Sequence, residues 1–550
     1  MTTTPADWWR GATLYQVYPR SFADSNGDGI GDLAGITARL DYIARLGVDG
    51  IWLSPFFKSP MRDFGYDVSD HCCVDPTFGT LADFDTLLAR AHTLGLKVLI
   101  DQVWSHTAIE HPWYQKSRTS RDERTNPKAD WYVWADAKPD GSPPSNWQSW
   151  MGGPSWTWEP RRQQYYLHNF LPQMPDLNLH NPEVQDAMLA VGRFWLERGV
   201  DGFRLDTANY YCHDPAFRDN PPQLPEHRGC TPAAMQQHLH DICQPQTLPF
   251  LERVRTLCDE FEGRMTVAEI GSQNNLQRMV EYTRGQDRLH TAYSFMLLGA
   301  QPKAAALAEA QAAWHEGDGA AAWPSWALSN HDAPRVATRW AQGNVPRTRQ
   351  LLALLACLRG TVFLYQGEEL GLPQADLALE ELQDPFGMAN WPHEPGRDGC
   401  RTPMPWMAGT HALGFTTGQP WLPLAPAHQA LAVDSQEADT GSTLHLTRRL
   451  LALRRRHAAL RLGELATLHA DEQVWVLRRQ HGADTVWAAF NFGPQAQALT
   501  VPGLPAAAAI ELQLAAAQLQ GSRLTLPAAS ALVMVADTAA PCGGPSPSAR

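Results

Sequence analysis

The sequence predicts an α/β fold: a (β/α)8 TIM barrel with a domain inserted after its third strand and a C-terminal antiparallel β-domain. Three patterns support this prediction. Short apolar stretches alternate with helix-like segments between residues 14 and 365, one long segment interrupts the alternation, and apolar side chains follow a two-residue period near the end. Strand–helix alternation is typical of a parallel sheet, whereas a two-residue period is typical of antiparallel strands.

The predicted barrel strands are short and mostly apolar, as buried parallel strands are. Helix patterns separate them, including one that ends before Gly47, one over residues 81–94 and one over residues 182–198. Eight strand–helix repeats fit a closed barrel better than an open sheet. The predicted strands cover residues 14–19, 50–53, 97–101, 200–206, 264–269, 291–295, 325–330 and 361–365.

Residues 102–174 interrupt the alternation because they are rich in Trp, Pro, Asn and Gly and have no sustained period. We therefore predict an inserted domain there. The predicted barrel comprises residues 1–101 and 175–462, with a loop excursion at about 372–400 and a closing helix at 444–457. Residues 463–538 are expected to form the C-terminal β-domain, and the Gly-, Pro- and Ser-rich end, 539–550, is expected to be disordered.

Composition argues against several classes of partner. The formal net charge is −13, from 45 Lys and Arg against 58 Asp and Glu, which argues against binding nucleic acid or an anionic membrane. No apolar stretch is long enough to span a bilayer, and the first ten residues do not resemble a signal peptide. The 21 Trp mostly suit core packing, but their faces also suit sugars. The sequence leaves the oligomeric state open.

The cysteines indicate a reducing environment. There are nine, an odd number, and none has CxxC spacing, so we expect buried thiols and a cytoplasmic location. One group of His and Cys side chains raises zinc binding as an alternative, although its spacing matches no standard zinc pattern. That group is His227, Cys230, His238, His240 and Cys243.

Acidic residues stand at the ends of three predicted strands. The fourth strand ends in Asp206, with Arg204 two positions earlier and therefore on the same face. The fifth ends in Glu269, and Asp332 closely follows the seventh. Because the C-terminal ends of barrel strands form the active-site face, these acids are expected at one rim. Salt-bridge scaffolding is the structural alternative.

Cleavage of a glycosidic bond requires such a set of groups. One carboxylate attacks the anomeric carbon, and one carboxylic acid protonates the leaving oxygen. The acid must have a raised pKa, whereas the nucleophile must stay ionised. We expect the positive charge of Arg204 to keep Asp206 anionic.

Four segments resemble signature regions of the α-amylase family, glycoside hydrolase family 13. They are DQVWSH at 101–106, GFRLD at 202–206, VAE at 267–269 and NHD at 330–332, and the match runs from about residue 8 to residue 406. The resemblance implies Asp206 as nucleophile, Glu269 as general acid/base and Asp332 as a third acid that binds sugar hydroxyls. It also implies that His106, Arg204 and His331 line the same subsite, that Asp101 buttresses Arg204, and that no organic cofactor is needed.

Within that family the chain is most similar to the α-glucosidase and oligo-1,6-glucosidase branch. The segment DFGYD at 63–67 resembles one in which the first acid, here Asp63, binds the terminal glucose and the Tyr, here Tyr66, stacks on its ring. The implied partner of Asp63 is Arg397, with Arg401 as the alternative. Such a pair closes the cleft behind the terminal sugar, which implies removal of single glucose units from non-reducing ends.

Four further positions refine the resemblance. Ser105 stands where the family often has Asn, which argues against the calcium site at the barrel–insert junction of many α-amylases, and Met174 replaces the Gln usual in oligo-1,6-glucosidases. Thr207 resembles α-1,4-acting members, whereas Val there accompanies α-1,6 preference. Phe170 is a predicted further wall of the site, with core packing as its alternative. We predict a retaining exo-α-glucosidase for maltose-type linkages that also transfers glucose.

The first predicted βα loop, DSNGDGIGD at 24–32, alternates oxygen-bearing and small side chains. Such a loop suits a hard cation, although Gly35 at position twelve excludes an EF-hand. The resemblance implies a structural Ca²⁺ or Mg²⁺ bound here, and a solvated turn is the alternative. The implied ligands are Asp24, Asn26, Asp28, the carbonyl of Ile30, and Asp32.

Two other functions remain open. A sucrose-acting transglucosidase or sugar isomerase can use the same scaffold, and the Pro-rich loop at 209–249 is placed to shape its acceptor side. A non-catalytic member, like the barrel domain of amino-acid transporter heavy chains, is disfavoured because those chains lack the acids and carry a membrane span. The expected partner is a short oligosaccharide or α-glucoside.

Overall fold

The computed structural model of the chain describes residues 7–271, 274–299, 303–314, 322–505 and 508–536. Eight parallel strands form one sheet in the order β11-β10-β9-β5-β2-β1-β13-β12. A parallel bridge from Ala292 to Pro324 joins its edges, so the sheet nearly closes and the predicted barrel is confirmed. The strands are β1 Thr13–Val17, β2 Gly50–Leu53, β5 Lys97–Gln102, β9 Gly202–Leu205, β10 Met265–Ile270, β11 Thr291–Ser294, β12 Ser325–Ala327 and β13 Thr361–Tyr365.

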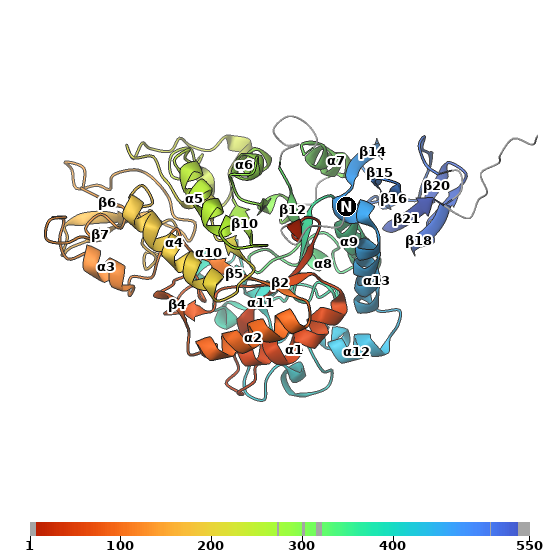
Figure 1. Cartoon of the computed structure of the whole chain (residues 1–550), viewed down its shortest axis with the longest axis horizontal. Coiled ribbons are helices and arrows are strands. Elements are labelled where there is room, and N and C mark those ends of the chain that lie inside the picture. Colours follow the sequence, from red (N-terminus) through yellow and green to blue (C-terminus); the bar gives the residue numbers. More distant parts are fainter. Residues whose placement is uncertain (1–6, 272–273, 300–302, 315–321, 506–507, 537–550) are drawn as a thin grey trace, which may run out of the picture.

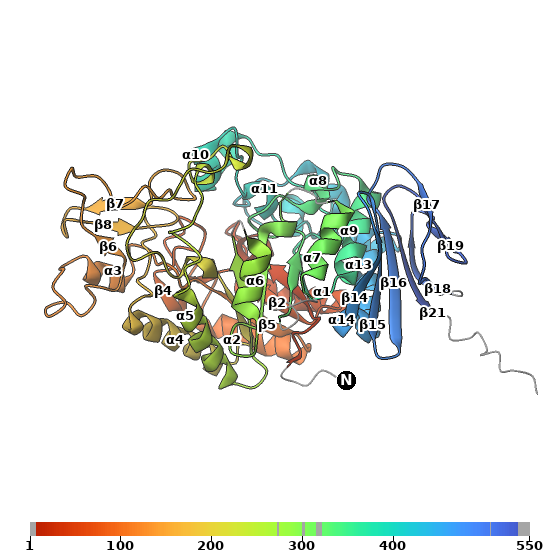
Figure 2. The ribbon, with the colours of Figure 1, turned by 90° about the horizontal axis from the view of Figure 1, so that it is seen from above.

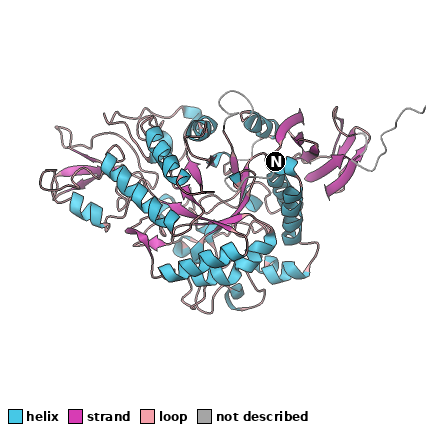
Figure 3. Cartoon of the chain, viewed as in Figure 1, coloured by secondary structure: helices cyan, strands magenta, loops and turns pink. Residues whose placement is uncertain are grey.

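Helices follow the barrel strands and surround them (Figures 1 and 3). Their ends obey local rules: the Asp32 carboxylate caps the first helix, and Gly47, at φ 89°, ends it in the left-handed region. The helices of the barrel are α1 Leu33–Leu46, α2 Leu81–Thr93, α4 Pro182–Glu197, α5 Thr247–Asp259, α6 Asn275–Thr283, α7 Ala304–Ala312, α8 Val336–Arg339, α9 Val345–Cys357, α10 Pro385–Asn390, α11 Asp398–Arg401, α12 Val433–Ala438, α13 Thr443–Arg456 and α14 Ala458–Leu462.

Alternation along β9 decides which of its side chains face the barrel interior. Phe203 and Leu205 are fully buried in the large apolar cluster that also includes residues of the surrounding helices. Arg204, between them, points to the opposite face. The barrel interior holds a second apolar cluster that includes Leu14, Trp52 and Met265. The Arg204 side chain therefore lies next to this apolar cluster, on the side of the C-terminal ends of the strands.

Two additions follow β2 and β5. A short hairpin of β3 Phe57–Lys58 and β4 Asp70–Val74 carries residues 59–69 in its loop. After β5 come α3 Pro112–Ser117 and a three-stranded antiparallel sheet in the order β6-β8-β7. These elements lie within residues 102–174, which we propose as the inserted domain. The sheet strands are β6 Trp134–Ala135, β7 Trp156–Glu159 and β8 Gln164–Leu167.

The C-terminal part is antiparallel. One sheet has the order β14-β15-β16-β21-β18, and a smaller one has the order β17-β20-β19. Figures 1 and 2 show these sheets and the insert at opposite ends of the molecule, with the barrel between them. The predicted disordered end, 539–550, lies outside the described residues. The strands are β14 Glu464–Ala470, β15 Val474–His481, β16 Asp484–Asn491, β17 Gln497–Thr500, β18 Ala508–Leu514, β19 Gln518–Gln520, β20 Arg523–Leu526 and β21 Ser530–Ala536.

Within the described ranges, no helix is both long and apolar enough to cross a membrane. The apolar face between the two C-terminal sheets is filled mainly by their own side chains, among them Val476, Leu524 and Leu532. The larger sheet also contacts the barrel, because Gln350 on α9 donates hydrogen bonds to the carbonyls of Asn491 and Ser530, both at 2.7 Å.

Candidate active site

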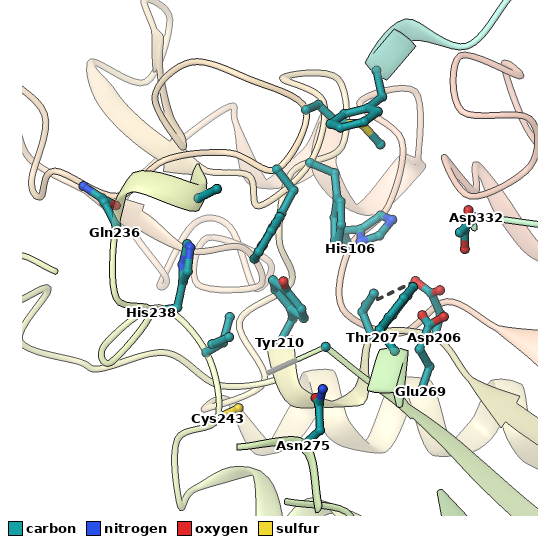
Figure 4. A pocket seen from close by; sticks show the side chains of 18 of the residues that line it. His106, Asp206, Thr207, Tyr210, Gln236, His238, Cys243, Glu269, Asn275 and Asp332 are labelled. Carbon is teal, nitrogen blue, oxygen red and sulfur yellow. Dashed lines mark hydrogen bonds between the residues drawn. The ribbon is translucent and has the colours of Figure 1, made fainter. Parts of the chain in front are cut away.

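A cavity of about 640 Å³ opens at the C-terminal ends of the barrel strands. Figure 4 shows Asp206, Glu269 and Asp332 toward one end of it and Gln236, His238 and Cys243 toward the other. Two sequence-predicted residues, Arg204 and His331, are fully buried and are not among its lining residues. The predicted residues that line it are Asp63, Tyr66, His106, Phe170, Asp206, Glu269, Asp332 and Arg397.

One arginine joins three acids beneath the cavity. Arg204 Nη1 lies 2.7 Å from Asp101 Oδ1 and 2.5 Å from Asp206 Oδ1. Its Nη2 lies 2.6 Å from Glu269 Oε1. Tyr293 adds a hydroxyl that donates to the same Glu269 oxygen at 3.0 Å. We call Asp101, Arg204, Asp206 and Glu269 the Arg204 cluster.

Burial dominates the ionisation of the Arg204 cluster. It raises the pKa of Asp206 to about 7 and that of Glu269 to about 7, and the attraction of Arg204 offsets this only in part. Because the single guanidinium charge is shared by three carboxyls, Arg204 does not keep Asp206 fully anionic in the free protein, which corrects that sequence-based expectation. Two interacting acids with such pKa values hold about one proton between them near neutral pH.

Asp332 has the opposite electrostatic environment. Its Oδ1 lies 2.8 Å from Arg401 Nη2 and 3.5 Å from Arg397 Nη1, and its Oδ2 lies 3.1 Å from His331 Nε2. Burial opposes ionisation, but His331 and the two arginines outweigh it and hold the pKa of Asp332 well below its usual range. Asp332 is therefore ionised near neutral pH.

Arg397, rather than Arg401, contacts Asp63. Arg397 Nη2 donates to Asp63 Oδ1 at 2.6 Å, whereas Arg401 donates to the carbonyl of His331 and to Asp332. Burial raises the pKa of Asp63 to about 6 despite Arg397. The structure thus brings together the pair that the resemblance implied, from the β3–β4 loop and the start of α11.

Sequence reasoning missed Asp384, which orients Arg397. Its carboxylate accepts from Arg397 Nη2 at 2.7 Å, from Nε at 3.0 Å and from the backbone N–H at 2.7 Å. Burial raises its pKa, but these contacts prevail and lower it to about 2. The sequence signal, an Asp before Pro385, predicts a helix cap and not this contact. We call Asp63, Asp332, Asp384, Arg397 and Arg401 the Arg397 cluster.

Aromatic and imidazole rings complete the wall. The Tyr66 and His331 rings stack with centroids 5.4 Å apart, and the Tyr66 hydroxyl lies 2.5 Å from His331 Nε2. The half-buried Phe170 ring lies 5.2 Å from the His106 ring and 5.4 Å from that of Tyr210. Phe170 therefore contacts the predicted subsite and lines the cavity, while also packing against the core.

The other end of the cavity comes largely from residues 223–243, between β9 and α5, with Trp150 and Met151 added from the segment after β5. His238 stacks on Trp150, with centroids 4.9 Å apart, and its Nδ1 lies 2.6 Å from Asp241 Oδ2. Sequence reasoning grouped His238 with possible zinc ligands. Across the part of the chain that the structure describes, no group of three or more His, Cys, Asp or Glu side chains can hold a metal ion.

In the first βα loop, the oxygens of the predicted metal ligands accept hydrogen bonds mainly from backbone N–H groups in or next to the loop. Asp24 accepts backbone N–H groups of Asn26, Gly27 and Gly29 at 2.8–2.9 Å. Asp28 accepts the N–H of Ile30 at 2.8 Å. Asp32 accepts the N–H of Gly35 at 2.6 Å, because it caps α1. The donor set is all oxygen and so fits a hard cation, but each carboxylate already has a partner.

Comparison with known proteins agrees with this geometry. The family model described as alpha amylase, catalytic domain, matches residues 16–463. The chain belongs to the α-amylase family, whose members include glycoside hydrolases. A probable alpha-glucosidase of Rhizobium meliloti is 52% identical over 511 residues, which cover 90% of this chain and 91% of that protein.

Further relatives show how close the likeness is. An oligo-1,6-glucosidase of Halalkalibacterium halodurans is 35% identical, covering 88% of this chain and 90% of that protein. Among solved structures, the alpha-glucosyl transfer enzyme XgtA has a TM-score of 0.91 and 51% identity, covering 97% of this chain and all of that one. The trehalulose synthase MutB of Pseudomonas mesoacidophila has a TM-score of 0.86 and 29% identity, covering 96% and 99%. The chain is accordingly a glycoside hydrolase of the α-glucosidase group.

Proposed function

We propose that this protein is a retaining, exo-acting α-glucosidase that releases glucose from the non-reducing ends of short α-1,4-glucosides. One observation carries the proposal: a single guanidinium, that of Arg204, contacts both Asp206 and Glu269 in the cavity that Asp63 and Arg397 also line. A shared guanidinium keeps two carboxyls close. A double displacement requires a separation of about 5–5.5 Å, whereas an inverting mechanism needs a wider gap.

The reaction follows from the one proton that the two acids share. Glu269 gives that proton to the glycosidic oxygen while Asp206 attacks C1 of the terminal glucose, so the C1–O bond breaks and the leaving sugar departs as an alcohol. Glu269, now a carboxylate, then takes a proton from water, whose oxygen attacks C1 and releases Asp206. Two inversions at C1 give net retention. A sugar hydroxyl in place of water gives transfer.

Binding roles are assigned by position. Asp332 stays ionised and so can accept hydrogen bonds from sugar hydroxyls, while Asp63 and Arg397 bind the far side of the terminal glucose. Tyr66 and Phe170 supply ring faces for the C–H surface of the sugar. His106, with Arg204 and His331 behind it, completes the subsite.

The test follows maltotriose digestion by proton NMR. We expect α-glucose as the first product, in equal amount with maltose. β-Glucose as the first product would exclude retention, and release of maltose from the non-reducing end would exclude the removal of single glucose units. Isomaltose cleaved much faster than maltose would contradict the assignment of Thr207 to α-1,4 preference.

A second candidate is a transglucosidase or sugar isomerase that acts on sucrose. It is favoured by the likeness to XgtA and MutB and by the extra wall that residues 223–243 build opposite the acids. Chromatography of sucrose digests distinguishes the activities. Glucose and fructose in equal amounts indicate hydrolysis, an isomeric disaccharide indicates an isomerase, and fructose in excess over glucose indicates transfer.

We also propose a structural Ca²⁺ or Mg²⁺ in the first βα loop and a reducing, cytoplasmic location. The loop supplies hard oxygen donors whose carboxylates keep further lone pairs, and a bound cation requires them to turn toward one another, because the structure does not gather them into a metal-holding group. The described cysteines are all free thiols, which supports the location. Mass spectrometry of bound metal, with Asp28→Ala as the matched variant, tests the site. Equal metal content in both proteins would exclude it.

A further inference from the structure

A chain of hydrogen bonds leads from the insert-proximal side of the cavity to Asp206. Ser105 Oγ lies 2.9 Å from His106 Nδ1 and 3.0 Å from Thr207 Oγ1. Thr207 Oγ1 in turn lies 3.1 Å from Asp206 Oδ2, the contact drawn between these residues in Figure 4. His106 Nε2, at the other end, lies 3.1 Å from the carbonyl oxygen of Tyr66. Two hydroxyls therefore connect an imidazole to the carboxyl proposed as nucleophile.

The positions of the hydrogens in this chain follow from its two ends. The Tyr66 carbonyl can only accept, so His106 Nε2 must carry the proton. Burial lowers the pKa of His106 to about 3, so the ring is neutral and its Nδ1 is a bare acceptor. Ser105 must then donate its hydroxyl hydrogen to Nδ1. Its oxygen faces Thr207 with lone pairs only.

This arrangement sets two demands on the single hydrogen of the Thr207 hydroxyl. If Thr207 donates this hydrogen to Ser105, a lone pair of the Thr207 oxygen faces Asp206 Oδ2. That lone pair can accept a hydrogen bond from Asp206 when the carboxyl is protonated. If Thr207 instead donates this hydrogen to an ionised Asp206, the Ser105 and Thr207 oxygens, 3.0 Å apart, face each other with lone pairs only. The Ser105 contact therefore favours the neutral form of Asp206.

The backbone shows that Thr207 is held in this position. It has φ 42° and ψ 46°, a left-handed conformation that is costly for a β-branched residue. Its hydroxyl is the group that reaches back to both Ser105 and Asp206. Ser105 itself is buried, on the segment that follows β5.

We propose that Ser105 is a positioning residue that fixes the direction of the Thr207 hydroxyl and thereby tunes the proton affinity of Asp206. This inference rests on the proposed role of Asp206 as nucleophile. Ser105 does not line the cavity and acts only through Thr207 and His106.

Other charges act on Asp206 from every neighbouring element, and the test must hold them constant. Burial already raises its pKa to about 7, against the attraction of Arg204. Substitution at Ser105 leaves all of these groups in place. They are Arg204 on β9, Asp101 on β5, Glu269 on β10, Asp332 after β12, and the hydroxyls of Tyr66 and Tyr211.

The test is a double-variant cycle read from pH profiles of kcat/KM on 4-nitrophenyl α-glucoside. In Ser105→Ala, Thr207 is free to donate to the ionised Asp206. We therefore expect the acidic limb, the pH range in which kcat/KM rises as Asp206 loses its proton, to move down by about one pH unit. A shift of this size corresponds to one hydrogen bond to a charged group. Ser105→Asn keeps a donor for His106 and offers a second N–H to the Thr207 oxygen. Thr207 can then donate to the ionised Asp206, so the acidic limb should again move to lower pH. In a Thr207→Val background, Ser105→Ala should move nothing.

Three outcomes overturn the inference: no shift in Ser105→Ala, an upward shift, or an equal shift with and without the Thr207 hydroxyl. A purely structural role would lower kcat at every pH and leave the limb in place. Asp206→Asn separates this failure from failure of the proposed function. If that folded variant keeps full activity, the nucleophile is misassigned, whereas an unshifted limb with an inactive Asp206→Asn rejects Ser105 alone.

Discussion

The Arg204 and Arg397 clusters each combine three acids with arginine, yet they differ in ionisation. In the first, one guanidinium serves Asp101, Asp206 and Glu269, and burial raises the pKa of all three. In the second, two guanidinium groups serve three acids, and the pKa values of Asp332 and Asp384 are lowered. The partners that favour the charged form, His331 and two arginines at Asp332 and the Arg397 contacts at Asp384, separate these acids from the Arg204 cluster, and burial alone does not.

This difference suits two kinds of work within one cavity. A proton that is retained near neutral pH can be given to a leaving oxygen, which general acid catalysis requires. Carboxylates that stay ionised can instead accept hydrogen bonds from sugar hydroxyls at any working pH. Asp63 is intermediate, since burial raises its pKa to about 6 although Arg397 touches it. The comparison can be tested by changing one member of each cluster.

Removal of the proton donor should have the largest effect. Glu269→Ala is expected to lower kcat on maltose by about 10²–10⁴-fold. The loss should be smaller on 4-nitrophenyl α-glucoside, because nitrophenolate leaves without a proton. Azide should restore activity on the aryl substrate and give α-glucosyl azide, identified by NMR. β-Glucosyl azide would instead mark position 269 as the nucleophile.

Loss of the two-pronged guanidinium contacts of Arg397 should lower activity less than loss of the proton donor. Arg397→Lys keeps the charge but cannot contact Asp63 and Asp384 together, so kcat/KM on maltose should fall about 10- to 100-fold, the worth of one or two charged hydrogen bonds. The acidic limb of the pH profile should stay where it is. A shifted limb would show that Arg397 also sets the protonation of Asp206 and Glu269. Asp384→Asn is the matched variant and should reproduce the loss in part.

The smallest effects are on stability, and they should have opposite signs. Because the folded pKa of Asp206 is raised, its contribution is present below pH 4 and is lost as the pH rises toward 7. Asp206→Asn should therefore raise Tm by a few degrees at pH 8, and the gain should fade toward pH 4. The folded pKa of Asp384 is lowered, so Asp384→Asn should lower Tm above pH 4, with the gap closing as the pH falls toward 2.

Differential scanning calorimetry from pH 2 to pH 8 measures both changes. Gln518, which is exposed to solvent on β19 and far from both clusters in the sequence, provides a neutral control as Gln518→Ala. If both carboxyl variants change Tm in the same direction at pH 8, the contrast between the clusters is wrong.

Residues on or next to the strands were predictable from the sequence because strand ends map directly onto the barrel rim. Asp206 and Glu269 lie where their strands predict, and Arg204 faces inward because of simple alternation. The barrel followed from the same regularity. The roles assigned to these residues remain proposals that the experiments above test.

Contacts between distant loops were not predictable in the same way. Asp384 meets Arg397 through a turn whose path depends on packing, and local sequence shows only a helix cap. The weakness of Arg204 as a counter-charge is also a tertiary effect, because it depends on how many carboxyls surround it. Sequence alone gives the charges along the chain but not their ratio within a cluster.

The two ends of the cavity are encoded in separate parts of the chain. The acids and Arg397 come from strand ends and one distant helix start, whereas the opposite wall comes largely from the run 223–243, with Trp150 added by the segment after β5. A continuous run can be exchanged, lengthened or shortened in a single genetic event. The choice of acceptor can therefore change while the site for the donor sugar stays the same. Residues 223–243 are the natural segment to exchange when the acceptor specificity is to be altered.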